Sequence, residues 1–180
     1  MVQRFRTLNP RKRTWVYAGL ALAAGVGLVT SRPRKGLGGA GSARPRTLGL
    51  GARLLLVGGA AAGLATPLRR LAHEAGVTFH VEQRLDPAVV ARFRPTVALV
   101  AADIVPPHAA AFVARVCGAG ARLVWILPAG ASPSIAASLV TAGAEIFRVD
   151  ALSIPRGPDG AHPSVMGYAG LAGAIWRWLG

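Results

Sequence analysis

The chain of 180 residues contains one cysteine, and its first 50 positions contain no acidic residue. A single cysteine, Cys117, excludes a disulfide bond within the chain. Its place in an apolar run predicts a buried, inert thiol, because free cysteine behaves as a small hydrophobic residue. His, Cys, Asp and Glu residues nowhere show the spacing of a metal site, so we expect no bound metal.

Nucleotide-binding motifs are missing as well. The run Gly58-Gly59-Ala60-Ala61-Ala62-Gly63 is rich in small residues. Ala60 stands where a G-x-G-x-x-G motif needs its second glycine, and Leu64 follows where a P-loop needs lysine. The sequence therefore predicts no phosphate-binding loop, and we expect no cofactor.

Charge is distributed unevenly along the chain. The first 50 residues carry ten Lys and Arg, whereas residues 51–180 carry eleven Arg against seven Asp and Glu. Most of the net charge of +14 thus belongs to an N-terminal arm. A basic arm beside an apolar segment favours anionic lipid head groups as its partner, and nucleic acid is not expected.

Residues 15–30 form a run of sixteen residues without a charge. A helix of that length covers roughly 24 Å of the ~30 Å hydrocarbon core. Trp15 and Tyr17 fit an interfacial aromatic belt, and Gly19, Ala23 and Gly27 line one face on which another membrane helix could pack. The basic residues that could contact lipid or a partner are Arg11, Lys12, Arg13, Arg32, Arg34 and Lys35.

This pattern predicts a single-pass membrane protein with an N-terminal anchor. A secretory signal peptide and a buried soluble helix are the alternatives. Basic residues flank both ends of the run, so the side of the membrane that holds the remaining chain is not fixed. The predicted organisation is a basic arm (1–14), a transmembrane helix (15–30), a basic Gly/Pro linker (31–51) and a folded domain (52–180).

Short apolar runs alternate with amphipathic segments after residue 52. Strands are predicted at 53–57, 77–81, 96–101, 122–127 and 145–149. Helices are predicted at 61–75, 86–93, 108–118, 132–142 and 164–179. Alternating strands and helices predict a five-stranded parallel sheet covered on both faces. The expected fold class is a three-layer α/β/α, flavodoxin-like sandwich.

Several stretches of residues 53–180 resemble the SGNH/GDSL hydrolase family. The run Pro158-Asp159-Gly160-Ala161-His162-Pro163, followed by Gly167-Tyr168-Ala169, is similar to the Asp-x-x-His block that closes this family. The run LLLVGGAAAGLATPLRRLAHEAGV resembles its first strand, nucleophile turn and following helix. The runs PTVALVAADIV and GARLVWILPA resemble its third and fourth strands. The resemblance implies the SGNH-type version of the sandwich.

The resemblance also implies which residues would form the site. In active members a serine attacks an acyl carbonyl, and a histidine oriented by an aspartate accepts its proton. Asp159 and His162 match that pair, but Ala60 stands at the serine position. Gly59 and Val105 stand where the family carries the residue before the serine and the oxyanion-hole asparagine. No glycine of a second oxyanion block lies between residues 77 and 92. We therefore expect a pseudoenzyme and not an enzyme.

The leading hypothesis is a membrane-anchored, catalytically inactive SGNH-like protein that serves as a structural or interaction subunit. Its assembly would be a membrane complex, a cell-envelope machine or a virion, and its partners other assembly proteins and anionic lipid. One alternative is an esterase or deacetylase acting on acylated envelope glycans, with Ala60 in place of a native serine. The other is a remnant of such an enzyme that still binds a glycan.

Overall fold

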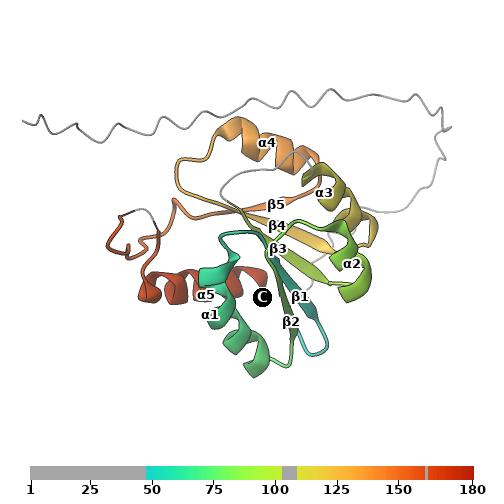
Figure 1. Cartoon of the computed structure of the whole chain (residues 1–180), viewed down its shortest axis with the longest axis horizontal. Helices are drawn as coiled ribbons and strands as arrows, with labels where there is room; N and C mark the ends of the chain where they lie inside the picture. The colour runs from blue at the N-terminus through green and yellow to red at the C-terminus, as the bar shows by residue number, and fades with distance from the viewer. Residues whose placement is uncertain (1–47, 103–108, 161) are drawn as a thin grey trace, which may run out of the picture. The chain divides into compact units, whose positions relative to one another are not determined.

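The computed structural model of the protein describes residues 48–102, 109–160 and 162–180. Five parallel strands form one sheet in the order β2-β1-β3-β4-β5 (Figure 1). The strands are β1 (Arg53–Val57), β2 (Thr78–Glu82), β3 (Val97–Ala101), β4 (Arg122–Leu127) and β5 (Glu145–Arg148). The helices are α1 (Ala61–Glu74), α2 (Pro87–Phe93), α3 (Ala109–Gly118), α4 (Pro133–Thr141) and α5 (Val165–Leu179). This order confirms the predicted five-stranded, flavodoxin-like α/β fold.

Two apolar cores hold helices against the two faces of the sheet. Successive side chains of a strand point to opposite faces, so neighbouring leucines of β1 enter different cores. Leu54 and Leu56 pack with residues of α1 and α5. Leu55 and Val57 pack with residues of α2, α3 and α4. Figure 1 shows the same division, with α1 and α5 on one side of the sheet.

The burial of each strand follows its position in the sheet. Every residue of the central strand β3 is buried, as its continuous apolar sequence requires. The edge strands are more polar, with Thr78 and His80 exposed on β2 and Glu145 and Arg148 exposed on β5. Edge strands with polar side chains are protected from uncontrolled pairing with other chains.

Polar side chains mark where three of the helices begin. The Asp86 carboxylate accepts a hydrogen bond of 2.8 Å from the Ala88 N–H at the start of α2. The Ser132 hydroxyl accepts one of 3.3 Å from the Ser134 N–H at the start of α4. Ser164 Oγ accepts one of 3.0 Å from the Gly167 N–H at the start of α5. Such caps satisfy amide groups that have no partner inside the helix.

Two expectations about individual segments need comment. Cys117, predicted to be buried, is exposed at the end of α3, because this position of the helix faces away from the core that holds Phe112 and Val116. None of the helices within the described ranges has the length and apolar composition needed to cross a bilayer. The predicted anchor at 15–30, its small-residue face and its flanking basic residues lie outside those ranges.

Candidate functional site

A pocket of about 100 Å³ lies at the carboxyl ends of β1, β3 and β4. The chain leaves β1 for β2 on one side and continues to β3 on the other side, so the pocket lies at the switch point of the sheet. Parallel α/β sheets bind ligands in the crevice at this point. Most of the lining is apolar, formed by Ala60, Leu64, Ala101, Ala102, Ile126, Pro128, Ala129, Val149 and Leu171.

The turn between β1 and α1 is fastened to the end of β3. Gly58 has φ +119°, and a Cβ at this position would overlap the Ala101 carbonyl group. That carbonyl accepts a hydrogen bond of 3.1 Å from the Ala60 N–H, and the Gly58 carbonyl accepts one of 3.0 Å from the Ala61 N–H. Both amides are therefore engaged within the fold, which leaves neither of them to bind an oxyanion or a phosphate.

Tyr168 forms another part of the pocket wall, and Gly63 makes room for it. The Tyr168 ring lies against Gly63 so closely that a Cβ on Gly63 would overlap the ring carbons. Gly63 belongs to α1 and Tyr168 to α5, so the two helices meet at this contact. The absence of a side chain at residue 63 thus sets the position of an aromatic ring that lines the pocket.

The segment from Pro155 to Ser164 forms a turn closed by main-chain hydrogen bonds. The Ser164 N–H donates to the Pro155 carbonyl at 2.9 Å, and the Gly157 N–H donates to the His162 carbonyl at 2.8 Å. Arg156 and Pro163 face each other in an antiparallel bridge. This turn brings Arg156 and His162 to the pocket, and both residues belong to its lining.

Asp159 and His162 form a close pair within the turn. His162 Nδ1 lies 2.6 Å from Asp159 Oδ2, and the His162 N–H donates to Asp159 Oδ1 at 3.1 Å. With a neutral ring, the proton belongs on Nδ1 and the lone pair on Nε2, since a carboxylate accepts hydrogen bonds. Both side chains are more than half exposed, at 65% for His162 and 51% for Asp159.

A second charged pair lies just beyond β5. Arg148 Nη2 donates to Asp150 Oδ2 at 2.7 Å and Arg148 Nε to Asp150 Oδ1 at 3.2 Å. The hydrogen bonds from Arg148 lower the pKa of Asp150 below its ordinary value, and the same contact raises the pKa of Arg148. Val149, which lies between them in sequence, lines the pocket, whereas neither Arg148 nor Asp150 is among its lining residues.

The pocket lining contains few polar groups. Among the described residues that line it there is no serine, threonine or cysteine, and its ionisable groups are Arg156, His162 and Tyr168. No cluster of three or more His, Cys, Asp or Glu that could hold a metal occurs in the described part of the chain. An apolar pocket with a few polar groups on one side fits a small molecule with a polar end.

The structure brings together some of the residues singled out from the sequence. Ala60 and His162 line the same pocket, and Asp159 holds the His162 ring. Gly59 does not line it, and a Cβ on Gly59 would meet nothing. Val105 and the N-terminal residues lie outside the described ranges. Arg156 and Tyr168 were not among the predicted site residues, although both lie close in sequence to the Asp159/His162 turn.

Comparison with known proteins gives matches among solved structures alone. No family model and no curated protein matches the chain. A receiver domain of the Francisella response regulator 1452 is 10% identical, with 72% of this chain and 99% of that chain covered and a TM-score of 0.44. The signal receiver domain of a LuxO repressor protein from Vibrio parahaemolyticus is 16% identical, with coverage of 72% and 98% and a TM-score of 0.44. The signal receiver domain of a modulated diguanylate cyclase from Desulfovibrio desulfuricans G20 is 14% identical. The match covers 68% of this chain and 97% of that chain, with a TM-score of 0.41.

These comparisons correct the predicted family. The solved structures that match are receiver domains and not SGNH hydrolases, and no family model supports the SGNH/GDSL assignment. The predicted function depended on the SGNH/GDSL assignment. The hypothesis of an inactive SGNH-like structural subunit of a membrane or envelope assembly is therefore also wrong. So are its alternatives as a glycan esterase or the remnant of one. At TM-scores of 0.41–0.44, the likeness to receiver domains carries no argument about function either.

The Asp-x-x-His motif has a local explanation. The Asp159 carboxylate accepts hydrogen bonds from both the main chain and the ring of His162, three residues later. Short polar side chains commonly close turns in this way, whatever the family. The motif therefore reports the conformation of the turn and not its ancestry.

Proposed function

We propose that the domain is a non-catalytic binding module for a small carboxylate with a short apolar body. The observation that carries this proposal is the pocket at the switch point of the sheet, with a mostly apolar lining to which the turn adds Arg156 and His162. A guanidinium group matches the planar geometry of a carboxylate and can bind both of its oxygens. The apolar residues would bury the remainder of the ligand.

The size of the pocket limits the ligand. Pockets for drug-sized molecules measure about 300–1,000 Å³, whereas this one measures about 100 Å³. A carboxylate with a few carbon atoms fits that volume, whereas a nucleotide or an oligosaccharide would extend well beyond it.

Two features support binding without catalysis. No aliphatic hydroxyl or thiol group from the described residues lines the pocket, so an acyl intermediate on serine, threonine or cysteine has no nucleophile among them. The Ala60 and Ala61 amides, which lie where a helix N-terminus could stabilise an oxyanion, already donate to carbonyl groups of the fold. Together these features remove two of the largest contributions to acyl-transfer catalysis.

The proposal is tested by calorimetric titration of the full chain with butyrate, and with butanol and butylamine as ligands of similar size. We expect butyrate to bind and the two others not to bind. Ala60→Leu, which extends a side chain into the pocket, should abolish binding. Ala91→Leu on the exposed surface of α2 is the matched control and should leave binding unchanged.

Two results would overturn the proposal. Equal binding of butyrate to the protein and to its Ala60→Leu variant would place the ligand elsewhere. Turnover of an acyl ester that disappears in His162→Ala would show that the Asp159/His162 pair is a catalytic base.

The membrane location predicted for residues 15–30 is a separate proposal. It is supported by the uncharged sixteen-residue run and the basic residues on both sides of it. Anionic lipid head groups and other membrane proteins are the partners that this segment would contact.

A further inference from the structure

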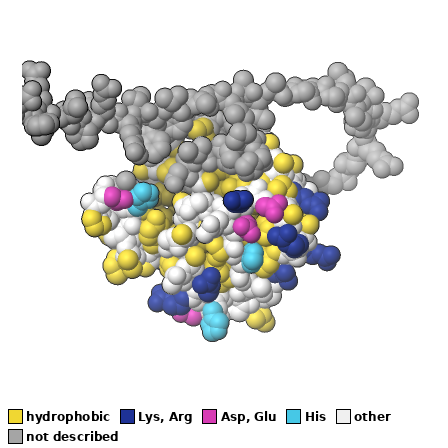
Figure 2. Space-filling model, viewed as in Figure 1, with side chains coloured by type: hydrophobic (Ala, Val, Ile, Leu, Met, Phe, Trp, Pro, Cys, Tyr) yellow, Lys and Arg dark blue, Asp and Glu magenta, His cyan; other side chains and the backbone are white. Residues whose placement is uncertain are grey.

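Arginine side chains surround the exposed edge of β2. Figure 2 shows Lys and Arg side chains gathered over the right and lower parts of the domain, where Figure 1 places α2, β2 and the end of α1. The exposed arginines of this region are Arg69 and Arg70 on α1, Arg84 after β2, Arg92 on α2 and Arg94 after α2. The region holds five of the eleven arginines of residues 51–180.

Most of these arginines are not neutralised by a neighbouring carboxylate. Arg70 has Glu74 at 3.8 Å, but within the described ranges no ion pair joins Arg69, Arg84, Arg92 or Arg94 to an acidic residue. The two nearest carboxylates on β2 and α2 accept main-chain hydrogen bonds instead. Glu82 accepts one from the Gln83 N–H, and Asp86 accepts one from the Ala88 N–H.

The edge strand itself offers main-chain groups for pairing. β2 is the last strand on its side of the sheet. The Thr78 N–H bonds to the Ala52 carbonyl at 2.9 Å, and the Glu82 carbonyl accepts from the Gly58 N–H at 3.0 Å. Since alternate residues of a parallel strand bond to the same neighbour, the N–H and C=O groups of Phe79 and Val81 point away from the sheet. An extended peptide could therefore add to β2 as a further strand.

Arg94 supports a binding role for this surface. It has φ 50° and ψ 62°, and among the described residues it alone has a positive φ without being glycine. The left-handed conformation after a helix favours glycine, so an arginine here lowers stability. Arg94 follows Phe93, whose ring stacks on His80 of β2 at 5.2 Å, so this cost places one more arginine near the exposed edge, two residues from Arg92.

Charge decides which occupant fits. The first 50 residues of the chain carry ten basic and no acidic residues, so they are repelled by this surface. A second copy of the domain would bring the same arginines edge to edge. We propose that the basic β2 edge, defined as the outer side of β2 with Arg69, Arg84, Arg92 and Arg94, binds an acidic, extended segment of a partner protein. The segment continues the sheet and pairs its carboxylates with these arginines.

The test measures fluorescence anisotropy of a labelled peptide of alternating glutamate and valine, added to the full chain. We expect binding that weakens with added salt. The Arg92→Gln/Arg94→Gln variant should weaken it by about tenfold, as expected for the loss of two charge-assisted contacts. Arg115→Gln/Arg177→Gln on other helices is the control for charge and should retain the affinity. Replacing Arg32, Arg34 and Lys35 with glutamine should also retain it.

Two further comparisons separate strand addition from simple charge attraction. In an added strand only every second residue donates its N–H to β2, so one of two peptides, N-methylated either on its valines or on its glutamates, should lose affinity. Arg94→Gly should raise the melting temperature while it weakens binding, because glycine relaxes the left-handed backbone. This variant keeps the test interpretable if the double variant does not fold.

Several results would overturn the proposal. Unchanged affinity in Arg92→Gln/Arg94→Gln would exclude the basic β2 edge as the site. Binding of both N-methylated peptides as tightly as the unmodified peptide would exclude strand addition. Tighter binding of a single-stranded oligonucleotide, with the same dependence on Arg92 and Arg94, would identify nucleic acid as the partner instead.

Discussion

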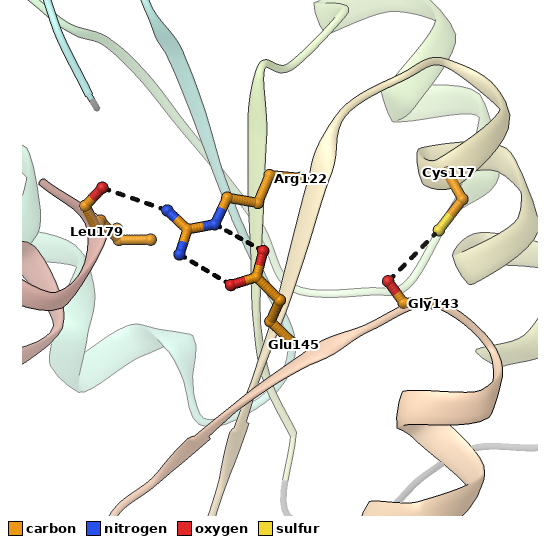
Figure 3. A network of polar contacts seen from close by, with 5 residues as sticks. All are labelled: Cys117, Arg122, Gly143, Glu145 and Leu179. Atoms are coloured by element: carbon orange, nitrogen blue, oxygen red, sulfur yellow. Dashed lines mark hydrogen bonds and ion pairs between the residues drawn. The ribbon is translucent and has the colours of Figure 1, made fainter. Parts of the chain in front are cut away.

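Arg122 binds Glu145 through two hydrogen bonds of 2.8 Å, from Nε to Oε1 and from Nη2 to Oε2 (Figure 3). Its third nitrogen, Nη1, donates to the Leu179 carbonyl at 3.2 Å. The guanidinium carbon lies 4.8 Å from the centre of the Trp178 ring. One side chain therefore joins β4, β5 and the end of α5.

Loss of the Glu145 carboxylate should destabilise the domain. The Arg122 side chain is 14% exposed, so its charge is poorly solvated without a partner. We expect Glu145→Gln to lower the free energy of unfolding by about 1–3 kcal/mol. Glu74→Gln breaks the exposed 3.8 Å ion pair with Arg70 and should change the free energy of unfolding by less than about 0.5 kcal/mol. Urea denaturation measures both, and equal effects would contradict the role assigned to Arg122.

Gly63→Ala should destabilise the protein, although alanine normally favours a helix over glycine by up to about 1 kcal/mol. The new methyl group would overlap the Tyr168 ring, and overpacking of this kind costs about 1–3 kcal/mol. Gly170→Ala in α5 is the control, since a Cβ there meets nothing, and it should stabilise. In thermal unfolding, Gly63→Ala should lower the melting temperature and Gly170→Ala should raise it.

The same substitution should weaken ligand binding. Displacement of the Tyr168 ring changes a wall of the pocket, so butyrate should bind less tightly to Gly63→Ala than to the unchanged protein. Adding Tyr168→Leu to Gly63→Ala should restore much of the stability. If it does not, the ring is not the group that the methyl displaces.

The Asp150 carboxyl should titrate at a pH below its ordinary value, because Arg148 donates hydrogen bonds to it. Arg148→Gln should raise that pKa, which a carbon-13 NMR titration measures directly. A carboxyl with a lowered folded-state pKa stabilises the fold above its unfolded-state pKa, and this contribution is lost as pH falls through the folded-state value. The stability difference between the protein and Arg148→Gln should therefore be present at neutral pH and vanish well below pH ~4.

The predicted anchor can be tested by fractionation. The full chain should sediment with membranes and resist extraction by alkaline carbonate, because an apolar helix is held by the hydrocarbon core. Deletion of residues 15–30 should release the protein into the supernatant. Release of the full chain by carbonate would contradict the anchor, and recovery of a shortened chain without residues 15–30 would favour a cleaved signal peptide.

The sequence predicted the strands and helices well because the sheet imposes a simple pattern. β3 and β4 are covered on both faces, so their residues are almost continuously apolar and the segments are easy to recognise. The helices predicted at 86–93 and 132–142 start at Asp86 and Ser132, which are the N-cap residues of α2 and α4. Each of these signals lies within one short segment, so it can be recognised from the amino-acid sequence alone.

The site was predicted less well, because its features depend on contacts between distant segments. The contact of Gly63 with Tyr168 spans two helices, and the hydrogen bond from the Ala60 N–H to the Ala101 carbonyl joins a turn to the end of β3. No pattern within either segment encodes them. The family assignment failed for the opposite reason, since Asp159 and His162 lie three residues apart and a turn alone explains their pairing.

The bond from Arg122 to the Leu179 carbonyl gives α5 two unlike ends. The Arg122 guanidinium group fixes the final turn to β4, and the Leu179 side chain of this turn is buried in the core. The first turn carries the exposed Val165 and Met166, at 87% and 74%, and holds to the fold chiefly through Gly167 and Tyr168. Amide hydrogen exchange along α5 should accordingly slow from its start towards its end. The wall of the pocket would then open by fraying of the first turn, while the last turn stays in place.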